Sequence, residues 1–233
     1  MTNKKLLSVL TVSVLAAVPM TSQAFAGDVE VSSNIGFVSD YVFRGVSQSD
    51  ESIAVQGGFD VSYGNGLYAG VWGSNVDFDD NSQASSEIDL YAGYAGSIND
   101  ISYDVGAIYY AYPGASRSLD YDFWELSLAA GYDFGSVATS ASINYSPEFF
   151  GETGDAYYYA LNADMPLPAD LSLSAHVGHQ AFDDSDLDDY TDWSIGLGYN
   201  YSGFDLSLQY IDTNLDDVEV AEDRIVFGVS RSF

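Results

Sequence analysis

The sequence predicts an all-β fold, namely a transmembrane antiparallel up-and-down β-barrel of about 12 strands that forms after a signal peptide has been cleaved. Three observations lead to this prediction: an export signal at the N-terminus, alternation of apolar and polar residues with period two, and connections that alternate between short and long. Period-two alternation gives a strand one apolar and one polar face. Short turns opposite longer loops are typical of outer-membrane barrels.

Residues 1–26 have the features of a secretory signal peptide. Lys4 and Lys5 precede the apolar run 6–18, and Ala24-Phe25-Ala26 supplies an A-x-A cleavage site. The run is shorter than the roughly 20 residues that a membrane-spanning helix needs, and no later segment supplies a longer one. We therefore expect the mature chain, residues 27–233, to enter a membrane as strands.

Composition narrows the classes of partner. Cleavage removes two of the six basic residues, which leaves four against 35 acids and a net charge of about −31. Nucleic acid is excluded as a partner, because phosphate binding needs a cationic face. The chain has no cysteine, so neither a disulfide framework nor a thiolate metal site is available, and no cofactor is predicted. The remaining basic residues are Arg44, Arg117, Arg224 and Arg231.

The expected strands follow one another along the mature chain. In the first, Val29, Val31 and Ile35 alternate with polar or small residues, and the same pattern continues to the C-terminus. Most segments reach the 9 to 11 residues that a tilted membrane strand requires, and twelve is an even number, as in bacterial barrels. The predicted strands are 29–43, 53–63, 67–76, 86–95, 101–112, 121–134, 137–145, 156–165, 171–181, 191–201, 204–212 and 224–233.

The connections between these strands alternate in length. We expect the short ones to face the periplasm together with both termini, and the long ones to face outward from a Gram-negative outer membrane. Outer-membrane lipids and lipopolysaccharide are then the expected surroundings. The short connections are 64–66, 96–100, 135–136, 166–170 and 202–203, and the long ones are 44–52, 77–85, 113–120, 146–155, 182–190 and 213–223.

A repeat supports the same arrangement. Segments 87–94, 125–132 and 192–199 each begin with an acid and carry Gly six positions later and Tyr seven positions later, just before a short turn. The parity places the acid and Gly on the polar face and Tyr on the apolar face. The three tyrosines are therefore predicted to lie at one depth, as an interfacial girdle.

The C-terminus alternates through Ile225, Phe227 and Val229 and ends on an aromatic residue, Phe233. This ending resembles the signal by which the barrel assembly machinery recognises outer-membrane proteins. We therefore predict that Phe233 acts as an insertion signal.

One region also resembles a known family. Residues 38–49 read Val-Ser-Asp-Tyr-Val-Phe-Arg-Gly-Val-Ser-Gln-Ser, residues 56–60 read Gln-Gly-Gly-Phe-Asp, and residues 66–76 read Gly-Leu-Tyr-Ala-Gly-Val-Trp-Gly-Ser-Asn-Val. This is similar to the proteobacterial TorF family of porins, most sharply over 36–76. The resemblance implies an outer-membrane porin-like barrel and carries no catalytic or ligand-binding residues with it.

The polar face of the strands predicts an acidic lumen. Many inward positions are Gly, Ser or Ala, and twelve strands lie between the filled eight-stranded and the wide 16-stranded barrels, which favours a narrow wet pore. A dry interior is disfavoured, because the inward face has eleven acids against two or three bases and unpaired buried carboxylates are costly. Rings of Asp and Glu favour cations, so passive passage of small solutes with a preference for cations is the predicted function. The predicted pore-lining residues are Asp40, Arg44, Glu87, Asp89, Asp104, Glu125, His176, Asp192 and Arg224.

Arg44 has two interpretations. It ends the first predicted strand on the inward side, in an interior that is otherwise short of positive charge. It could face carboxylates across the constriction and set a transverse field. Alternatively, it only clamps the loop 44–52 by a salt bridge, which is the interpretation that we favour.

Two outer loops contain runs of acids that resemble the start of a calcium loop, D-x-[DN]-x-D-D. Both lack Gly at position six, and neither completes the EF-hand pattern. Solvated acidic loops explain them more simply, although divalent ions that bridge them to lipopolysaccharide remain an alternative. The candidate ligands are Asp184, Asp186, Asp188, Asp212, Asn214 and Asp216.

Three other classes of protein compete with a channel. A lipase would need a nucleophilic Ser near a His on the membrane-facing wall, and nothing around His176 or His179 resembles such a motif, so no enzyme is predicted. A secreted β-sandwich would leave too many aromatic residues outside its core. An adhesin or structural barrel without transport remains open, and conductance separates it from a porin.

Overall fold

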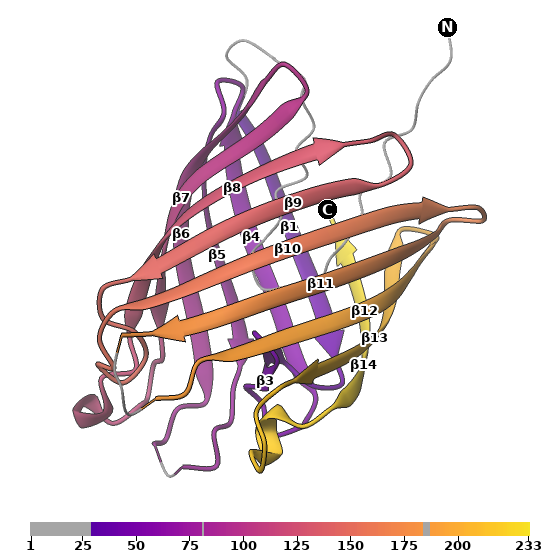
Figure 1. Ribbon diagram of the computed structural model, residues 1–233. Helices are drawn as coiled ribbons and strands as arrows, with labels where there is room; N and C mark the ends of the chain where they lie inside the picture. Colours follow the sequence, from indigo (N-terminus) through magenta and orange to yellow (C-terminus); the bar gives the residue numbers. More distant parts are fainter. Residues whose placement is uncertain (1–28, 81, 184–186) are drawn as a thin grey trace, which may run out of the picture.

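The computed structural model describes residues 29–80, 82–183 and 187–233, and it is a closed antiparallel barrel (Figure 1). The wall closes where β1 pairs with β14, for example Phe37 opposite Val229. The twelve wall strands are β1 (Val29–Val38), β4 (Ala54–Tyr63), β5 (Leu67–Asn75), β6 (Ser86–Ile98), β7 (Ile101–Ala111), β8 (Phe123–Asp133), β9 (Ala138–Ser146), β10 (Ala156–Leu167), β11 (Leu171–Phe182), β12 (Tyr190–Tyr201), β13 (Phe204–Thr213) and β14 (Arg224–Ser232). The predicted fold class and strand number are confirmed.

The wall is apolar outside and polar inside, which is the inverse of a soluble protein. On β6, the consecutive residues 87–90 alternate: Ile88 and Leu90 are 40% and 54% exposed, whereas Glu87 and Asp89 are 2% and 1% exposed. The same alternation runs through the other strands, because successive side chains of a strand point to opposite faces. Such an exterior suits a hydrocarbon surrounding, and a closed barrel leaves no unpaired strand edge within it.

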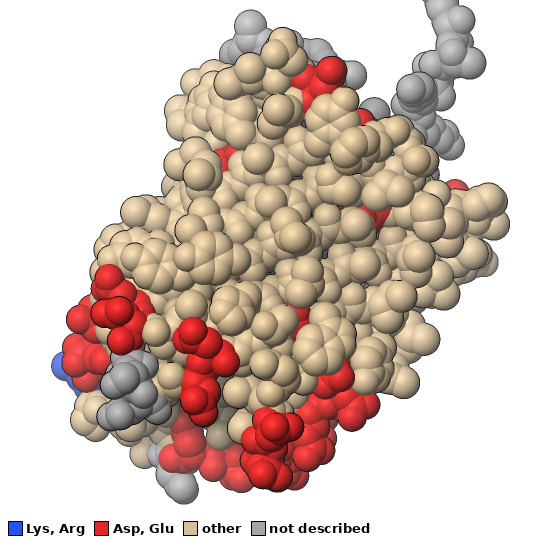
Figure 2. All heavy atoms as spheres, in the orientation of Figure 1, with Lys and Arg blue, Asp and Glu red and all other residues tan. Residues whose placement is uncertain are grey.

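The two ends of the barrel differ. Short turns and the C-terminus lie at the upper end of Figure 1, and the long loops lie at the lower end; we call these the short-turn end and the long-loop end. Acidic residues gather at the long-loop end, while the wall above them carries few charges (Figure 2). Among the described residues, no helix is long and apolar enough to cross a membrane.

The three tyrosines of the repeat lie at one level on the outside. Tyr94, Tyr132 and Tyr199 are each about 40% exposed. Each stands opposite the first residue of a neighbouring strand, in the pairs Leu67↔Tyr94, Ile101↔Tyr132 and Leu171↔Tyr199. Because these first residues all follow short turns, the tyrosines form part of a girdle near the short-turn end, where amphipathic rings favour a membrane interface.

The first predicted strand is wrong at its C-terminal end. The strand expected over 29–43 stops at Val38, and the chain then folds into a separate hairpin of β2 (Val42–Phe43) and β3 (Val46–Ser47). The other strand limits differ from the predictions by at most three residues. Two 3-10 turns, η1 (Arg117–Leu119) and η2 (Glu219–Ala221), lie in long connections.

Deleting Phe233 is expected to lower the amount of folded barrel. Its backbone closes the last ladder, because Phe233 N donates to Ser33 O at 2.8 Å and Ser33 N donates to Phe233 O at 3.1 Å. Its side chain is 69% exposed on the outside. The measurement is the fraction of heat-modifiable protein in outer membranes, and Phe233→Tyr, which keeps the backbone pairing and an aromatic ring, serves as the control. Unchanged assembly of the deletion would contradict the predicted role.

Candidate functional site

A hairpin lies inside the barrel near the long-loop end. We call residues 39–53, which include β2 and β3, the lumen hairpin. Arg44 and Gly45 form its two-residue turn with φ of 49° and 81°, as a type I′ turn requires. Tyr41, Ser47 and Ser49 are at most 4% exposed, so the lumen hairpin is enclosed by the wall.

Arg44 reaches from the tip of the lumen hairpin to the opposite wall. Its Nη2 donates to Glu125 Oε2 on β8 at 2.7 Å, and its Nη1 donates to Gln180 Oε1 on β11 at 2.8 Å. The guanidinium lies 4.2 Å from the centroid of the Tyr158 ring on β10 and 4.6 Å from that of Phe43. A guanidinium suits this position, since it offers several fixed donors and also packs on aromatic faces.

Gly45 allows the tip to approach the wall closely. A β-carbon placed there would lie 2.4 Å from Thr213 Cγ2 and 2.8 Å from Asp192 Cβ, and the positive φ is itself unfavourable for other residues. The tip therefore contacts β12 and β13 through Gly45, while the Arg44 side chain contacts β8, β10 and β11.

A second ion pair holds the base of the lumen hairpin. Arg224 Nη1 on β14 donates to Asp40 Oδ2 at 2.7 Å. The other oxygen of Asp40 accepts hydrogen bonds from the hydroxyls of Ser47 at 2.6 Å and Ser49 at 3.0 Å. Asp40 thus joins the start of the hairpin to its returning strand and to the barrel wall.

Two further carboxylates lie beside the lumen hairpin. The Tyr41 hydroxyl donates to Glu87 Oε1 at 2.9 Å, and the Tyr41 ring packs edge-on against Trp72 at 5.5 Å. Within the described part of the chain, Glu87 Oε2 and Asp89 Oδ1 are buried and have no hydrogen-bond partner. A buried acceptor without a partner is costly, so this pair requires an explanation.

His176 and Asp192 form a network on the other side of the lumen. His176 Nε2 lies 3.0 Å from Asp192 Oδ2, and His176 Nδ1 lies 2.7 Å from Asn162 Oδ1. The Tyr158 hydroxyl donates to Asp192 Oδ1 at 2.9 Å. Because the Arg44 guanidinium packs on the ring of Tyr158, Asp192 indirectly supports the tip of the lumen hairpin. His179 is on the membrane-facing side of the wall and contacts the hydroxyl of Thr191.

Asp104 lies in a different part of the lumen, toward the short-turn end. It accepts a hydrogen bond from the Tyr68 hydroxyl at 2.9 Å, and Asp60 accepts one from Tyr91 at 2.5 Å. Asp60, Asp104 and Asp164 all keep partial exposure. Small inward residues around them, such as the facing pair Ser102 and Gly131, leave this half of the lumen accessible to water.

The interior therefore has two halves, and the inward acids keep partial exposure in only one of them. At the level of the lumen hairpin, Glu125 is 1% and Asp192 3% exposed, which is the dry acidic interior that the sequence argument disfavoured. Neutral and cationic donors make this possible, because Arg44 donates to Glu125, Tyr158 donates to Asp192 and Tyr41 donates to one oxygen of Glu87.

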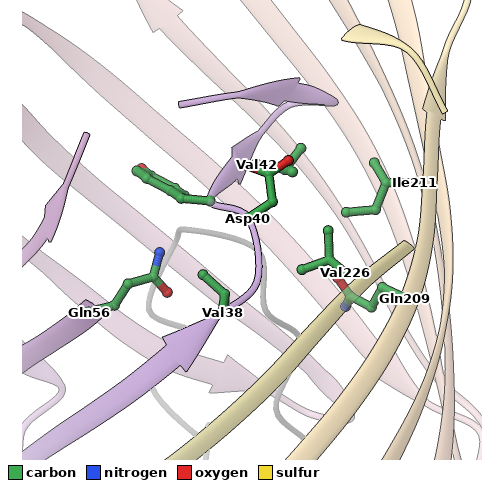
Figure 3. A pocket seen from close by; sticks show the side chains of 8 residues that line it. Val38, Asp40, Val42, Gln56, Gln209, Ile211 and Val226 are labelled. Atoms are coloured by element: carbon green, nitrogen blue, oxygen red, sulfur yellow. The ribbon is translucent and has the colours of Figure 1, made fainter. Parts of the chain in front are cut away.

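A small pocket lies between the lumen hairpin and the wall (Figure 3). Its volume is about 10 Å³. Its lining includes Val38, Asp40, Gln56, Gln209 and Val226. This volume holds about one water molecule. In this conformation the pocket is too small for a solute to pass.

A larger depression of about 500 Å³ lies among the outer loops. It is lined by Tyr112, Tyr121 and Phe149 and by charged residues that include Arg117 and Glu148. The Tyr121 hydroxyl donates to Asp80. Partial burial and this carboxylate raise the pKa of Tyr121 to about 12. Burial alone would raise the pKa of Asp80, but the hydrogen bonds from Ser82 and Tyr121 outweigh it and lower that pKa.

The structure gives the proposed calcium ligands different roles. Asp184 and Asp186 lie outside the described residues. Asp212 accepts a hydrogen bond from Thr213 N, and Asn214 Oδ1 accepts one from Thr191 N at 2.6 Å, so both bind backbone groups at the ends of β13 and β12. Asp188 and Asp216 are exposed. Within the described ranges, no group of three or more acids or histidines is arranged to hold a metal.

The sequence argument brought most of the pore-lining set to one place but missed its partners. Asp40, Arg44, Glu87, Asp89, Glu125, His176, Asp192 and Arg224 all lie around the lumen hairpin, and Asp104 does not. Tyr41, Tyr158 and Gln180 were missed. The available signal was Arg44-Gly45 between two pairs that each begin with the β-branched residue Val, Val42-Phe43 and Val46-Ser47, which indicates a tight hairpin.

A closed twelve-stranded barrel with an apolar wall, a polar lumen and a loop folded into that lumen defines a β-barrel of the porin type. The chain belongs to the family described as "Bacterial protein of unknown function (Gcw_chp)", whose model matches residues 22–233. The resemblance to the TorF family stays a prediction, since the matching model carries a different name. A comparison with curated proteins found no match.

Solved structures share the fold. The chain is similar to the KdgM porin, with a TM-score of 0.60 and 12% identity over 87% of this chain and 99% of that one. It is also similar to the KdgM porin in complex with disordered oligogalacturonate, with a TM-score of 0.61 and 9% identity over 87% and 98%. The outer membrane protein OpdK from Pseudomonas aeruginosa gives a TM-score of 0.47 and 10% identity over 78% and 58%.

Proposed function

We propose that the protein is a porin-like channel of the Gram-negative outer membrane, for passive passage of small solutes with a preference for cations. The observation that carries the proposal is an acid-rich lumen inside an apolar wall, with a hairpin held in that lumen by polar side-chain contacts and aromatic packing. The structure then represents a closed state. Outer-membrane lipids, lipopolysaccharide and the barrel assembly machinery are the proposed partners outside the lumen.

The charge of the lumen supports cations over anions. Both inward arginines are already paired, Arg44 with Glu125 and Arg224 with Asp40. Asp60, Asp104 and Asp164 remain in the accessible half without a basic partner among the described residues. Carboxylates around a narrow passage attract cations and repel anions. We therefore do not expect this chain to favour polyanions such as the oligogalacturonate of the KdgM complex.

A barrel without transport is the second candidate. The observation that favours it is the complete burial of Tyr41, Glu125 and Gln180 at the long-loop end, which leaves the barrel closed. A structural or adhesive barrel would need no opening, and its acidic loops would carry the function. Conductance separates the two candidates, because only a channel opens to ions.

If the channel prefers cations, its reversal potential in a KCl gradient should have the sign of the K⁺ equilibrium potential. Purified protein is placed in a planar bilayer under a roughly ten-fold KCl gradient, where a perfectly cation-selective channel would give about 59 mV. Replacing Asp104→Asn together with Asp164→Asn is expected to move the reversal potential toward zero, because it removes charge from the accessible half. Asp133→Asn, in an exposed turn where its carboxylate caps Gly135 N, is the matched control.

Anion preference in the wild type would overturn the proposed selectivity. A silent wild type does not by itself decide between the two candidates, because the structure is closed. Silence in a variant without the hairpin turn would instead support the barrel without transport.

A further inference from the structure

The unexplained feature of the lumen is the pair of carboxyl groups on β6. Glu87 and Asp89 are two residues apart on one strand, so their side chains share its inward face. They are 2% and 1% exposed, and one oxygen of each has no partner in the described part of the chain. Two carboxylates that both carry charge would repel each other strongly in such a place.

The groups that face this pair do not neutralise it. Tyr41 approaches from the lumen hairpin, Tyr110 and Tyr112 from β7 and the loop after it, Tyr91 from β6 itself and Glu125 from β8. All of these are phenols or acids. The nearest guanidinium, that of Arg44, is bound to Glu125. Two carboxylates and a few phenols also offer fewer oxygens than the 6 to 8 that a calcium ion prefers.

We propose that Glu87 and Asp89 together bind one proton, and that this acid pair is a pH-sensitive latch of the lumen hairpin. One proton removes one of the two like charges and gives the pair a donor, so this ligand fits two neighbouring buried acids that each have an unpaired oxygen. The proton leaves Glu87 Oε1 free to accept the hydrogen bond from Tyr41, which ties the latch to the hairpin.

The sign of the pH effect follows from the number of protons bound in each state. When the hairpin is docked, the pair is buried and holds its proton, as buried carboxyls can several pH units above the range in which exposed ones ionise. When the hairpin leaves the lumen, water reaches the pair and both carboxyls ionise at neutral pH. Docking therefore takes up one proton, so acid favours the closed state and alkaline conditions favour release.

One test follows channel opening across pH. Open probability in a planar bilayer is expected to rise by at least ten-fold between about pH 6 and about pH 10, since one coupled proton changes an equilibrium by up to about ten-fold per pH unit. Asp89→Asn cannot lose a proton and should stay closed across this range. Glu87→Gln, which keeps an oxygen for Tyr41, should behave in the same way. Asp100→Asn, in an exposed turn, should follow the wild type.

A second test measures hairpin release without relying on conductance. The chain contains no cysteine, so Ser47→Cys introduces a single thiol at a position that is 4% exposed, and Glu51→Cys introduces one on a side chain that is 57% exposed. The ratio of their labelling rates by a maleimide cancels the pH dependence of the reagent. This ratio should rise at least ten-fold from about pH 6 to about pH 10, and it should stay flat when Asp89→Asn is added.

The two tests distinguish this inference from the proposed function. The conductance test assumes that the protein is a channel, whereas the labelling test does not. A labelling ratio that does not change with pH, or that rises in Asp89→Asn and Glu87→Gln as much as in the wild type, would overturn the latch even if the protein conducts. A ratio that rises with pH and loses this rise in Asp89→Asn would support the latch even if no current is seen. Absence of current at the pH at which the hairpin is released would count against the channel proposal.

Discussion

Removing the turn of the lumen hairpin is expected to open the barrel. Replacing residues 42–47 by two glycines deletes Arg44 and Phe43, and with them the contacts to Glu125, Gln180 and Tyr110. If the undocked hairpin is a minor state of about 0.1–10%, as such equilibria commonly show, mean conductance should rise by about 10- to 1,000-fold. The measurement is ion current in planar bilayers, together with the swelling rate of proteoliposomes in small sugars.

The same excision in another loop provides the control. Replacing residues 114–119 by two glycines shortens the β7–β8 connection by the same number of residues, and that loop borders the outer depression rather than the lumen. It should leave conductance near the wild-type level. A folded, heat-modifiable hairpin variant that conducts no better than this control would contradict the role of the lumen hairpin as the closing element.

The barrel itself could be predicted because its signals are local. Period-two alternation alone places Ile88 and Leu90 on the outer face of their strand and Glu87 and Asp89 on the inner face. The short turns mark the strand ends. The Tyr94, Tyr132 and Tyr199 girdle could be predicted for the same reason. Successive residues of a strand alternate between its two faces. Once the face of one residue is known, the residues of that strand that line the lumen are known as well.

The lumen hairpin could not be predicted in the same way, because its environment is set by distant residues. Tyr41 and Phe43 continue the apolar parity of β1, which suggested membrane-facing positions, but they pack against Trp72 and Tyr110 inside the barrel. The partners of Arg44 are 81 and 136 residues away in sequence. A single sequence contains no sign of such pairings, and the aromatic side chains fit either environment.

The dry acidic half was missed because a count of charges ignores neutral donors. The inward acids outnumber the two or three inward bases, and this imbalance alone disfavoured a dry interior. Phenol hydroxyls supply much of what was missing, for example Tyr158 to Asp192 and Tyr41 to Glu87. The position of the pair Glu87 and Asp89, which these donors do not fully satisfy, depends on side-chain placement rather than on composition.

Arg44→Met is expected to release the lumen hairpin and to cost more than any other single substitution at the tip. It removes the guanidinium from Glu125, which is 1% exposed and would be left as a buried charge without a counter-ion. Breaking a buried pair in this way typically costs about 3–5 kcal/mol. Since about 1.4 kcal/mol is a factor of ten, the protection of Ser47→Cys from a maleimide should fall by more than about 100-fold.

A double-mutant cycle separates the ion pair from the lost packing. Glu125→Gln removes the stranded charge, so Arg44→Met with Glu125→Gln should regain part of the protection, and the coupling between the two positions should exceed about 1 kcal/mol. Arg117→Met, the same change at an exposed arginine on η1, should leave protection unchanged. If the double variant is as unprotected as Arg44→Met, packing of Arg44 between Phe43 and Tyr158 holds the hairpin and the ion pair contributes little. If Arg44→Met keeps full protection, the tip does not hold the hairpin, and the contacts nearer its base, Asp40 with Arg224 and Tyr41 with Glu87, must do so.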